Sequence, residues 1–359
     1  MRQQAAGSTL PFLRGYNYSS LEAWEARKAG RLLAARIELG CSCNFRCLYC
    51  NQGHQIPPRQ PLLLHETQDV VKQIRELEAV SVVIIGAGEP TIQPDFRELV
   101  SFIASSNLIP VVFTNGTGLD KDMVRFLFDH NASVMLKMDC LNPRTQDMLA
   151  GVHGASEVIQ GALDVLLNSG FPAREKQELR LGISFVSTLP NLDDIPDLWK
   201  FCRKNWIYPN HELLILRGRG QENMGLLQPN IEQTAELKTE LLRIDSSFGY
   251  SWVPYKPLTG WGCLQVLYSV YVACDGAVRP CADIDIPYFN IRQQRIREIL
   301  ESEFFQLVRN ISGHLRGKCK HCEFNSECIG CRGGAFANAT LRGETPASAV
   351  CSEDPFCWK

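Results

Sequence analysis

Short apolar runs and longer amphipathic segments alternate six times along the middle of this 359-residue chain. Runs rich in valine and isoleucine, each typical of one buried strand, occupy residues 36–40, 80–88, 109–116, 132–139, 179–187 and 212–218. Segments with apolar residues at helical spacing lie between or after them, at 65–77, 95–105, 120–129, 155–168, 193–204 and 231–244. Because such alternation indicates parallel strands joined by right-handed crossovers, the sequence predicts an α/β fold, either an open doubly wound sheet or a whole or partial barrel.

The composition of the chain limits the partners and the cellular compartment that we expect for this protein. Hydrophobic residues make up 45% of the chain, enough for a real core, and the formal net charge of −2 gives no general attraction to nucleic acid or to an anionic membrane. The longest apolar runs, such as 80–87, are far shorter than the ~20 residues that span a bilayer, and the N-terminus lacks a continuous apolar signal core. We therefore expect a cytoplasmic protein without membrane or nucleic-acid partners.

Fifteen cysteines are the most unusual feature of the composition. Four lie between residues 41 and 50, two stand alone at 140 and 202, and nine fall between 263 and 357. A reducing compartment does not favour structural disulfides, so metal or redox chemistry is the leading explanation. The two clusters of cysteines predict two sites, one in each part of the chain.

The first cysteine cluster follows the first predicted strand as Cys43-X3-Cys47-X2-Cys50. Three thiolates suit a four-iron cluster that keeps one iron open to another ligand, whereas a structural zinc site normally has four protein ligands. Cys41 or His54 would complete such a zinc site, which is the alternative interpretation.

Other motifs also stand at predicted strand ends. These are GAGEP (86–90), TNGT (114–117), KMDC (137–140) and LRGRG (216–220). Ligands of parallel α/β folds gather at the carboxyl ends of the strands, so the motifs predict one site built by many loops. Glycines there would let the backbone approach a ligand, although GAGEP alone is also compatible with a plain strand-to-helix turn.

The combination of CNFRCLYC, GAGEP and TNGT resembles the radical S-adenosylmethionine (radical SAM) enzymes over about residues 36–245. The resemblance implies a partial (β/α)6 barrel in which Cys43, Cys47 and Cys50 hold a [4Fe–4S] cluster. S-adenosylmethionine would chelate the open iron, and its reductive cleavage would give a 5′-deoxyadenosyl radical that abstracts hydrogen from the substrate. An external one-electron donor such as flavodoxin or ferredoxin is implied as well.

The same resemblance assigns roles to cofactor-binding residues. Tyr49 would place its backbone beside the adenine, and the segment at the second strand would bind the methionine amino group. That segment comprises Gly86, Ala87, Gly88 and Glu89. Asn115 and Asp139 are candidate ribose or substrate contacts.

One position departs from the family pattern. The family often has arginine before the glycine that follows the fourth strand, where this chain has Ala150–Gly151. The usual partner of the cofactor carboxylate is therefore missing there. Arg217 or Arg219, on the sixth-strand loop, would replace it, unless these arginines are simply solvated.

The C-terminal cysteines form a second pattern, which read alone would suit structural zinc. It resembles the SPASM extension of radical SAM enzymes, although the last spacing of Cys319-X2-Cys322-X5-Cys328-X2-Cys331 is usually X3. On that resemblance Cys263, Cys281 and Cys331 would bind a first auxiliary cluster, with Cys274 as a fourth ligand or an open iron. Cys319, Cys322 and Cys328 would bind a second, completed by Cys351 or Cys357, of which we favour Cys357.

These motifs divide the chain into three parts. We expect an N-terminal extension at 1–35, the partial barrel at 36–250 and a small cysteine-rich, iron–sulfur-binding domain at 251–359. Auxiliary clusters could accept an electron from a substrate radical, and this role favours a two-electron oxidation as the reaction. The alternative is that the clusters are purely structural.

Cys140, next to Asp139, is the other candidate catalytic residue. A thiol facing the radical site could donate hydrogen and make the enzyme an epimerase; the alternative is that Cys140 is a small buried hydrophobe.

About 35 residues precede the first strand, which favours a small-molecule substrate over a peptide with a recognised leader. Polar loop residues favour a hydroxylated or amino-bearing compound such as an aminoglycoside or sugar. The leading hypothesis is therefore oxidation of a carbinol in a small natural product, or its epimerisation. A peptide or protein maturase is the second hypothesis, and a noncatalytic zinc-ribbon binding protein is the third.

Overall fold

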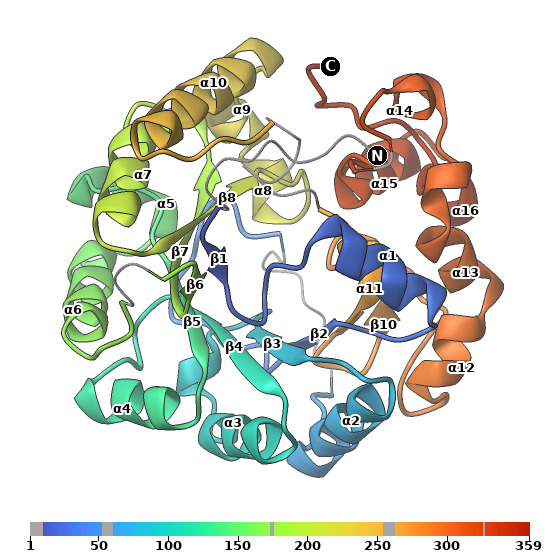
Figure 1. The fold of residues 1–359 in the computed structure, drawn as a ribbon, viewed down its shortest axis with the longest axis horizontal. Coiled ribbons are helices and arrows are strands. Elements are labelled where there is room, and N and C mark those ends of the chain that lie inside the picture. Colours follow the sequence, from blue (N-terminus) through green and yellow to red (C-terminus); the bar gives the residue numbers. More distant parts are fainter. Residues whose placement is uncertain (1–9, 52–59, 173–175, 254–262, 326) are drawn as a thin grey trace.

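A curved sheet with helices around its outer face forms the main body of the protein in a computed structural model, which describes residues 10–51, 60–172, 176–253, 263–325 and 327–359 (Figure 1). Six parallel strands lie in the order β2-β3-β4-β5-β7-β8. Their bounds are Ala34–Glu38 (β2), Ser81–Ile85 (β3), Ile109–Thr114 (β4), Ser133–Lys137 (β5), Leu181–Ser187 (β7) and Tyr208–Leu213 (β8). The partial barrel predicted from the sequence is confirmed.

Amphipathic helices cover the convex side of this sheet. They are Leu64–Glu76 (α2), Phe96–Ser105 (α3), Lys121–Asp129 (α4), Pro143–Ala150 (α5), Ala155–Leu167 (α6), Ile195–Lys204 (α7) and Ile231–Ser247 (α10), with the short α8 (Arg219–Glu222) and α9 (Met224–Leu227) after the last strand. The buried faces of the main helices share one hydrophobic core with the strands. None of the helices in the described residues is long and apolar enough to cross a membrane.

The sixth strand lies earlier than its predicted position at 212–218. β8 contains Pro209, which is unusual within a strand, and the polar residues Asn210 and His211, so its sequence does not look like a buried strand. The Asn210 side-chain nitrogen donates to Ser184 Oγ at 3.2 Å and to Glu212 at 3.0 Å, so the donor of this buried amide is satisfied. The apolar residues that follow do not extend the strand. Leu214, for example, packs in a separate buried hydrophobic cluster.

The C-terminal part of the chain adds two strands to the same sheet. β9 (Ser269–Val272) pairs in parallel with β2, and β10 (Val278–Arg279) pairs antiparallel with β9. Around them lie α11 (Gln265–Tyr268), α12 (Ile296–Glu301), α13 (Glu303–Arg309), α14 (Gly317–His321), α15 (Arg332–Leu341) and α16 (Pro346–Ala349). The N-terminal helix α1 (Ser20–Lys28) packs on this part, on the right of Figure 1, and shares its hydrophobic cluster.

The remaining elements are short. β1 (Phe12–Leu13) pairs with β6 (Glu178–Leu179), and 3-10 turns occupy Pro90–Ile92, Leu189–Asn191 and Ile311–Gly313.

A buried carboxylate joins α7 to α10 at the outer edge of the barrel. Asp245 is fully buried and accepts from both Nε and Nη2 of Arg203 at 2.7 Å. The indole nitrogens of Trp199 and Trp252 donate to the same carboxylate at 2.7 and 2.8 Å. A charge buried in this way stabilises the fold only while its partners are present.

We predict that Asp245→Ala lowers the free energy of unfolding by about 3–5 kcal/mol, because the Arg203 guanidinium then remains buried without its anion. Thermal and denaturant unfolding would measure the change. Glu240→Ala, which removes an exposed ion pair with Arg243 on the same helix, is the matched control and should change stability little. Equal effects of the two substitutions would contradict the structural role of Asp245.

Candidate active site

A cavity of about 540 Å³ opens at the carboxyl ends of the barrel strands. The strand-end motifs predicted from the sequence meet there. The lining includes Cys41, Cys43, Cys47, Tyr49, Cys50, Gly86, Ala87, Gly88, Glu89, Asn115, Lys137, Glu212 and Arg219.

The loop that carries Cys43, Cys47 and Cys50 is fixed to the end of α5 by backbone hydrogen bonds. The Arg46 and Leu48 amides donate to the last carbonyls of that helix, both at 2.9 Å. Gly151 ends the helix with a φ of +64°, and a Cβ there would lie 2.4 Å from the Arg46 carbonyl oxygen. Ala150–Gly151, where the sequence lacks the family's arginine, is therefore a place of close backbone contact.

The GAGEP turn is packed tightly against the same cysteine loop. A Cβ on Gly88 would lie 2.2 Å from the Ser42 carbonyl oxygen, and a Cβ on Gly86 would lie 1.8 Å from the Gly88 carbonyl oxygen. The Glu89 amide donates to that Ser42 oxygen at 2.9 Å. A side chain at Gly88 would thus separate the turn from the cysteine loop, and one at Gly86 would distort the turn itself.

The Glu89 carboxylate is occupied by neighbours in the protein. It accepts from the backbone and hydroxyl of Thr91 at 3.0 and 2.6 Å, from the Thr114 hydroxyl at 2.6 Å and from the Asn115 amide at 2.7 Å. Burial raises the pKa of Glu89, while these hydrogen bonds lower it. Glu89 thereby joins the ends of β3 and β4, and its side chain positions the site.

Asn115 lines the cavity and also orders the cysteine loop. Its side-chain amide donates to Asn44 Oδ1 at 3.0 Å, and its own oxygen accepts from the Thr117 amide at 3.0 Å. The Asn44 amide in turn donates to the Thr117 hydroxyl at 2.8 Å. The TNGT turn therefore holds the loop of Cys43 from the opposite side.

Asp139 does not line the cavity, contrary to the prediction of a catalytic contact. It is fully buried and accepts from the Tyr49 hydroxyl at 2.6 Å, from Lys137 Nζ at 2.7 Å and from the Val186 amide at 3.0 Å. The Lys137 ammonium also lies 4.7 Å from the centre of the Tyr49 ring. Asp139 is thus a positioning residue that fixes Tyr49 and Lys137, both of which face the cavity.

Cys140 also faces away from the cavity. Its thiol is buried and donates to the Asn142 carbonyl at 3.4 Å, and burial followed by the Asp139 charge raises its pKa to about 12. The structure therefore does not bring Cys140 to the radical site, and the packing interpretation fits its surroundings.

Of the two candidate arginines, Arg219 lines the cavity and Arg217 does not. Arg217 donates to the Ala282 carbonyl at 3.0 Å and pairs with Asp285 in the C-terminal part. The proposed contact of Arg217 with the cofactor carboxylate is thus wrong in this geometry, because its guanidinium is held elsewhere.

Lys137 and Glu212 are cavity residues that the sequence analysis did not single out. Both stand at the last position, or the last but one, of a parallel strand. Burial raises the pKa of Glu212, while the Lys137 charge lowers it. Lys137 could have been recognised as the first residue of the KMDC motif; the shifted sixth strand concealed Glu212.

Cys41 and Cys274 are joined in a disulfide across 233 residues. From the sequence, Cys41 was a candidate fourth ligand of a zinc site and Cys274 a candidate fourth ligand of the first auxiliary cluster. A sulfur bonded to another sulfur is not a thiolate ligand, so the structure removes both residues from the candidate donor sets. His54, the other residue that would complete a zinc site, lies outside the described residues.

The loop thiols and the glycine turn fit the cofactor set that the resemblance implies. Cys43, Cys47 and Cys50 are free thiols on the cavity wall, and with Cys41 in a disulfide this segment offers three sulfurs. Burial raises the pKa of Cys47 to about 12, so iron binding must displace a proton there. Beside them the GAGEP turn lines the same cavity, and its glycines allow it to lie directly against the cysteine loop.

The C-terminal cysteines form two neighbouring groups. Burial raises the pKa values of Cys263, Cys281 and Cys331 to about 12, and each pKa is raised further by the charge of another member of the trio. Burial likewise raises the pKa of Cys328 to about 11, with further increases from Cys357 and Cys322. The assignment of these cysteines to two auxiliary clusters stays a prediction.

Cys351 shares a buried hydrophobic cluster with Cys319. Its thiol donates to the Ala347 carbonyl at 3.3 Å. In the second group, Cys319 Sγ accepts from the Asp354 amide at 3.4 Å. Among the described residues, no three His, Cys, Asp or Glu side chains converge as they would on a single metal ion. A four-iron cluster binds its cysteines through separate irons, so its ligands need not converge on one point.

The loop after Cys50 touches the loop after Cys281 directly. The Asn51 amide donates to Asp283 Oδ1 at 2.8 Å, and Arg217 reaches the neighbouring Ala282 carbonyl at 3.0 Å. The two cysteine-rich parts of the chain therefore meet at the mouth of the cavity.

Comparison with known families identifies both parts. Residues 37–201 match the Radical SAM superfamily, and residues 263–323 match SPASM, an iron–sulfur cluster-binding domain. The second match replaces the zinc interpretation of the C-terminal cysteines. Together the matches imply [4Fe–4S] clusters and S-adenosylmethionine as cofactors.

Similar proteins cover nearly the whole chain. An AdoMet-dependent heme synthase of Methanosarcina barkeri is 26% identical over 357 residues, which cover 92% of this chain and 96% of that protein. The mycofactocin maturase MftC of Mycolicibacterium smegmatis is 27% identical over 85% of this chain and 78% of its own length. The crystal structure of Streptococcus suis SuiB bound to S-adenosylmethionine superposes with a TM-score of 0.71 at 16% identity, covering 92% of this chain and 78% of SuiB, and shows the same fold.

We predict that Gly88→Ala weakens S-adenosylmethionine binding by about tenfold or more, because the new methyl group must displace the Ser42 carbonyl and the cysteine loop. Equilibrium binding to the iron-reconstituted protein would measure the effect. Gly161→Ala, whose Cβ would meet nothing within 4 Å, is the matched control and should leave affinity unchanged. Normal affinity in Gly88→Ala would show that this turn does not shape the cofactor site.

Proposed function

Because this chain belongs to the radical SAM superfamily and carries a C-terminal SPASM domain, we propose that it catalyses the two-electron oxidation of a small-molecule substrate. The substrate class that fits the cavity is a hydroxylated or amino-bearing natural product, such as an aminoglycoside or sugar, oxidised at a carbinol carbon. When bound, the cofactor set supplies a hydrogen-abstracting radical and an acceptor for the second electron.

The contact between the two cysteine-bearing loops carries this proposal. Asn51 follows the last cysteine of the first loop, and its bond to Asp283 brings the Cys281 loop to the cavity mouth. A substrate between these loops would face a radical source on one side and an electron acceptor on the other. An oxidation needs both, whereas an epimerisation needs a hydrogen donor, and Cys140 does not face the cavity.

The polar lining of the cavity supports the substrate class. Lys137, Glu212 and Arg219 present an ammonium, a carboxyl group and a guanidinium to the same space, and Asn115 adds an amide. Such groups suit hydroxyl and amino substituents. The similarity to an AdoMet-dependent heme synthase, a protein named for a small-molecule product, agrees with this choice.

A peptide substrate is the second candidate. The observation that favours it is the similarity to a mycofactocin maturase over 85% of the chain. Mass spectrometry would separate the two candidates, since a maturase would modify a precursor peptide and leave free carbinols unchanged.

In this proposal the residues of the chain hold and orient the reacting groups. Cys43, Cys47 and Cys50 would hold the cofactor-binding cluster, Tyr49 and the GAGEP backbone would bind S-adenosylmethionine, and Arg219 would take its carboxylate in place of Arg217. Two further sets of cysteines would hold the auxiliary clusters: Cys263, Cys281 and Cys331, and then Cys319, Cys322, Cys328 and Cys357. Domain limits at 36–250 and 251–359 follow from this division.

We predict that Cys47→Ala abolishes 5′-deoxyadenosine formation, whereas Cys281→Ala retains it and loses the oxidised product. The reason is that Cys47 belongs to the loop that would hold the cofactor-binding cluster, whereas Cys281 is assigned to an auxiliary cluster. Chromatography of 5′-deoxyadenosine and product, with iron and sulfide content for each variant, would test both. Cys202→Ala, in the core of α7, is the control and should retain both products. Full product formation by Cys281→Ala would overturn the electron-acceptor role.

We further predict that Cys140→Ala leaves both the product and the rate of its formation unchanged, because the thiol faces Asn142 and not the cavity. Solvent deuterium found in the wild-type product, and lost in this variant, would instead establish epimerisation through Cys140.

A further inference from the structure

A second cleft, of about 460 Å³, lies between the N-terminal helix α1 and the C-terminal helices α12 and α13. Its floor includes Gly30 and Leu77, which precede strands β2 and β3. It therefore lies toward the amino ends of the strands, whereas the candidate active site lies at their carboxyl ends, and the two sites share no lining residue.

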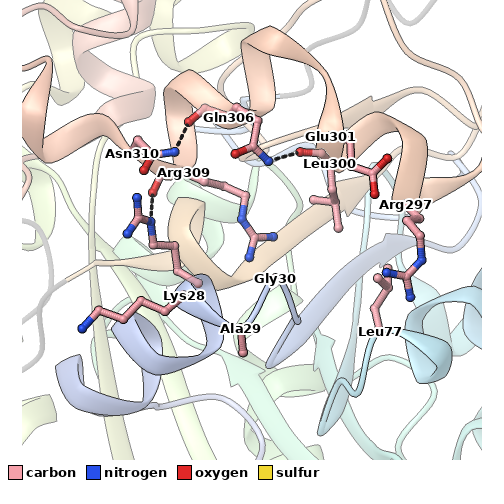
Figure 2. Close-up of a pocket in the computed structure, with 11 residues that line it drawn as sticks. Lys28, Ala29, Gly30, Leu77, Arg297, Leu300, Glu301, Gln306, Arg309 and Asn310 are labelled. Atoms are coloured by element: carbon pink, nitrogen blue, oxygen red, sulfur yellow. Dashed lines mark hydrogen bonds between the residues drawn. The ribbon is translucent and has the colours of Figure 1, made fainter.

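Cations dominate the walls of this cleft. Arg27, Lys28, Arg297 and Arg309 all line it, against the single carboxylate of Glu301. Figure 2 shows the Arg309 side chain crossing the middle of the cleft toward Gly30, with Lys28 on one side and Arg297 on the other. Among the described residues, none of these four cations is ion-paired with a carboxylate.

A favourable interaction with the ends of helices explains only some of the cations in this cleft. Arg27 and Lys28 occupy the last turn of α1, where cations interact favourably with the helix dipole in any case. Arg309 ends α13 but is only 4% exposed, so simple solvation does not explain it. A buried cation without an anion is costly, and burial together with Arg27 lowers the pKa of Arg309 to about 10.

The hydrogen bonds of Arg309 leave one donor group unused. Nη2 donates to the Arg31 carbonyl at 3.0 Å, and the backbone oxygen of Arg309 accepts from Arg27 Nε at 3.1 Å. Nη1 is buried and has no acceptor among the described residues. Since buried polar groups are nearly always satisfied, Nη1 is a donor that a bound acceptor would satisfy.

We propose that this cleft binds a phosphate group, either as inorganic phosphate or as the phosphate ester of a small molecule. A phosphate carries close to two negative charges and accepts paired hydrogen bonds from guanidinium groups, which matches the excess of cations and the free Nη1. The cleft is also wide enough for an attached organic group. A Cβ on Gly30 would meet nothing within 4 Å, so the floor leaves this space open.

Calorimetric titration of the cluster-loaded enzyme, saturated with S-adenosylmethionine and held at constant ionic strength, would test the site. Inorganic phosphate, glycerol 3-phosphate and acetate are the three probes. We expect saturable binding of at least one phosphate probe and none of acetate. Tighter binding of glycerol 3-phosphate than of inorganic phosphate would identify the ester as the form recognised. Acetate binding as tightly as phosphate, or no saturable binding, would overturn the proposal, with water as the acceptor for Nη1 in the latter case.

Substitutions separate this cleft from other anion sites. Arg309→Met should weaken phosphate binding by about tenfold or more, and the exposed Arg297→Ala by several-fold. Arg125→Ala, which removes an exposed guanidinium on α4, is the matched control and should leave affinity unchanged. If Arg309→Met does not fold, the double variant Arg27→Ala/Arg297→Ala serves instead. Unchanged affinity in a folded cleft variant would overturn the assignment, whatever the outcome for catalysis.

Discussion

The parallel pairing of β2 with β9 is the constraint on which the arrangement of the sites depends. Four residue pairs, from Ala34 with Ser269 to Ile37 with Val272, add the C-terminal part to the barrel sheet. Just beyond them the buried Glu38 carboxylate accepts from the Tyr271 hydroxyl and from the Cys274 amide. Both cysteine-bearing loops therefore leave one continuous sheet, and their separation is set by the register of two neighbouring strands.

Other buried carboxylates around the cavity also connect neighbouring strands and loops. Glu89 joins the ends of β3 and β4, and Asp139 connects β5 to Tyr49 and to β7. In a region of low dielectric constant, such charge-assisted hydrogen bonds hold loops in fixed positions. The acidic residues that stand out in the motifs thus prepare the site, and the groups left facing the cavity come from less conspicuous positions.

Local features of the site could be predicted from the sequence, and distant ones could not. The spacing of Cys43, Cys47 and Cys50 and the glycines of GAGEP express requirements within a few residues of chain, so they were recognisable. The sixth strand was misplaced because its sequence, YPNHEL, lacks a run of apolar residues, and its pairing with β7 is not visible in local patterns. The Cys41–Cys274 disulfide joins residues that are 233 positions apart in the sequence. Arg217 likewise binds Ala282 and Asp285, which lie 65 or more residues further along the chain.

The position of β2 has a consequence for how the protein is made. Until β9 leaves the ribosome, one edge of β2 has no strand beside it, although the barrel strands that follow β2 are already complete. At typical rates of synthesis β9 follows the last barrel strand, β8, by roughly 3–12 s, during which the free edge of β2 is open to pairing with other chains. The pairing with β9 therefore closes an edge of β2 that stays exposed during synthesis.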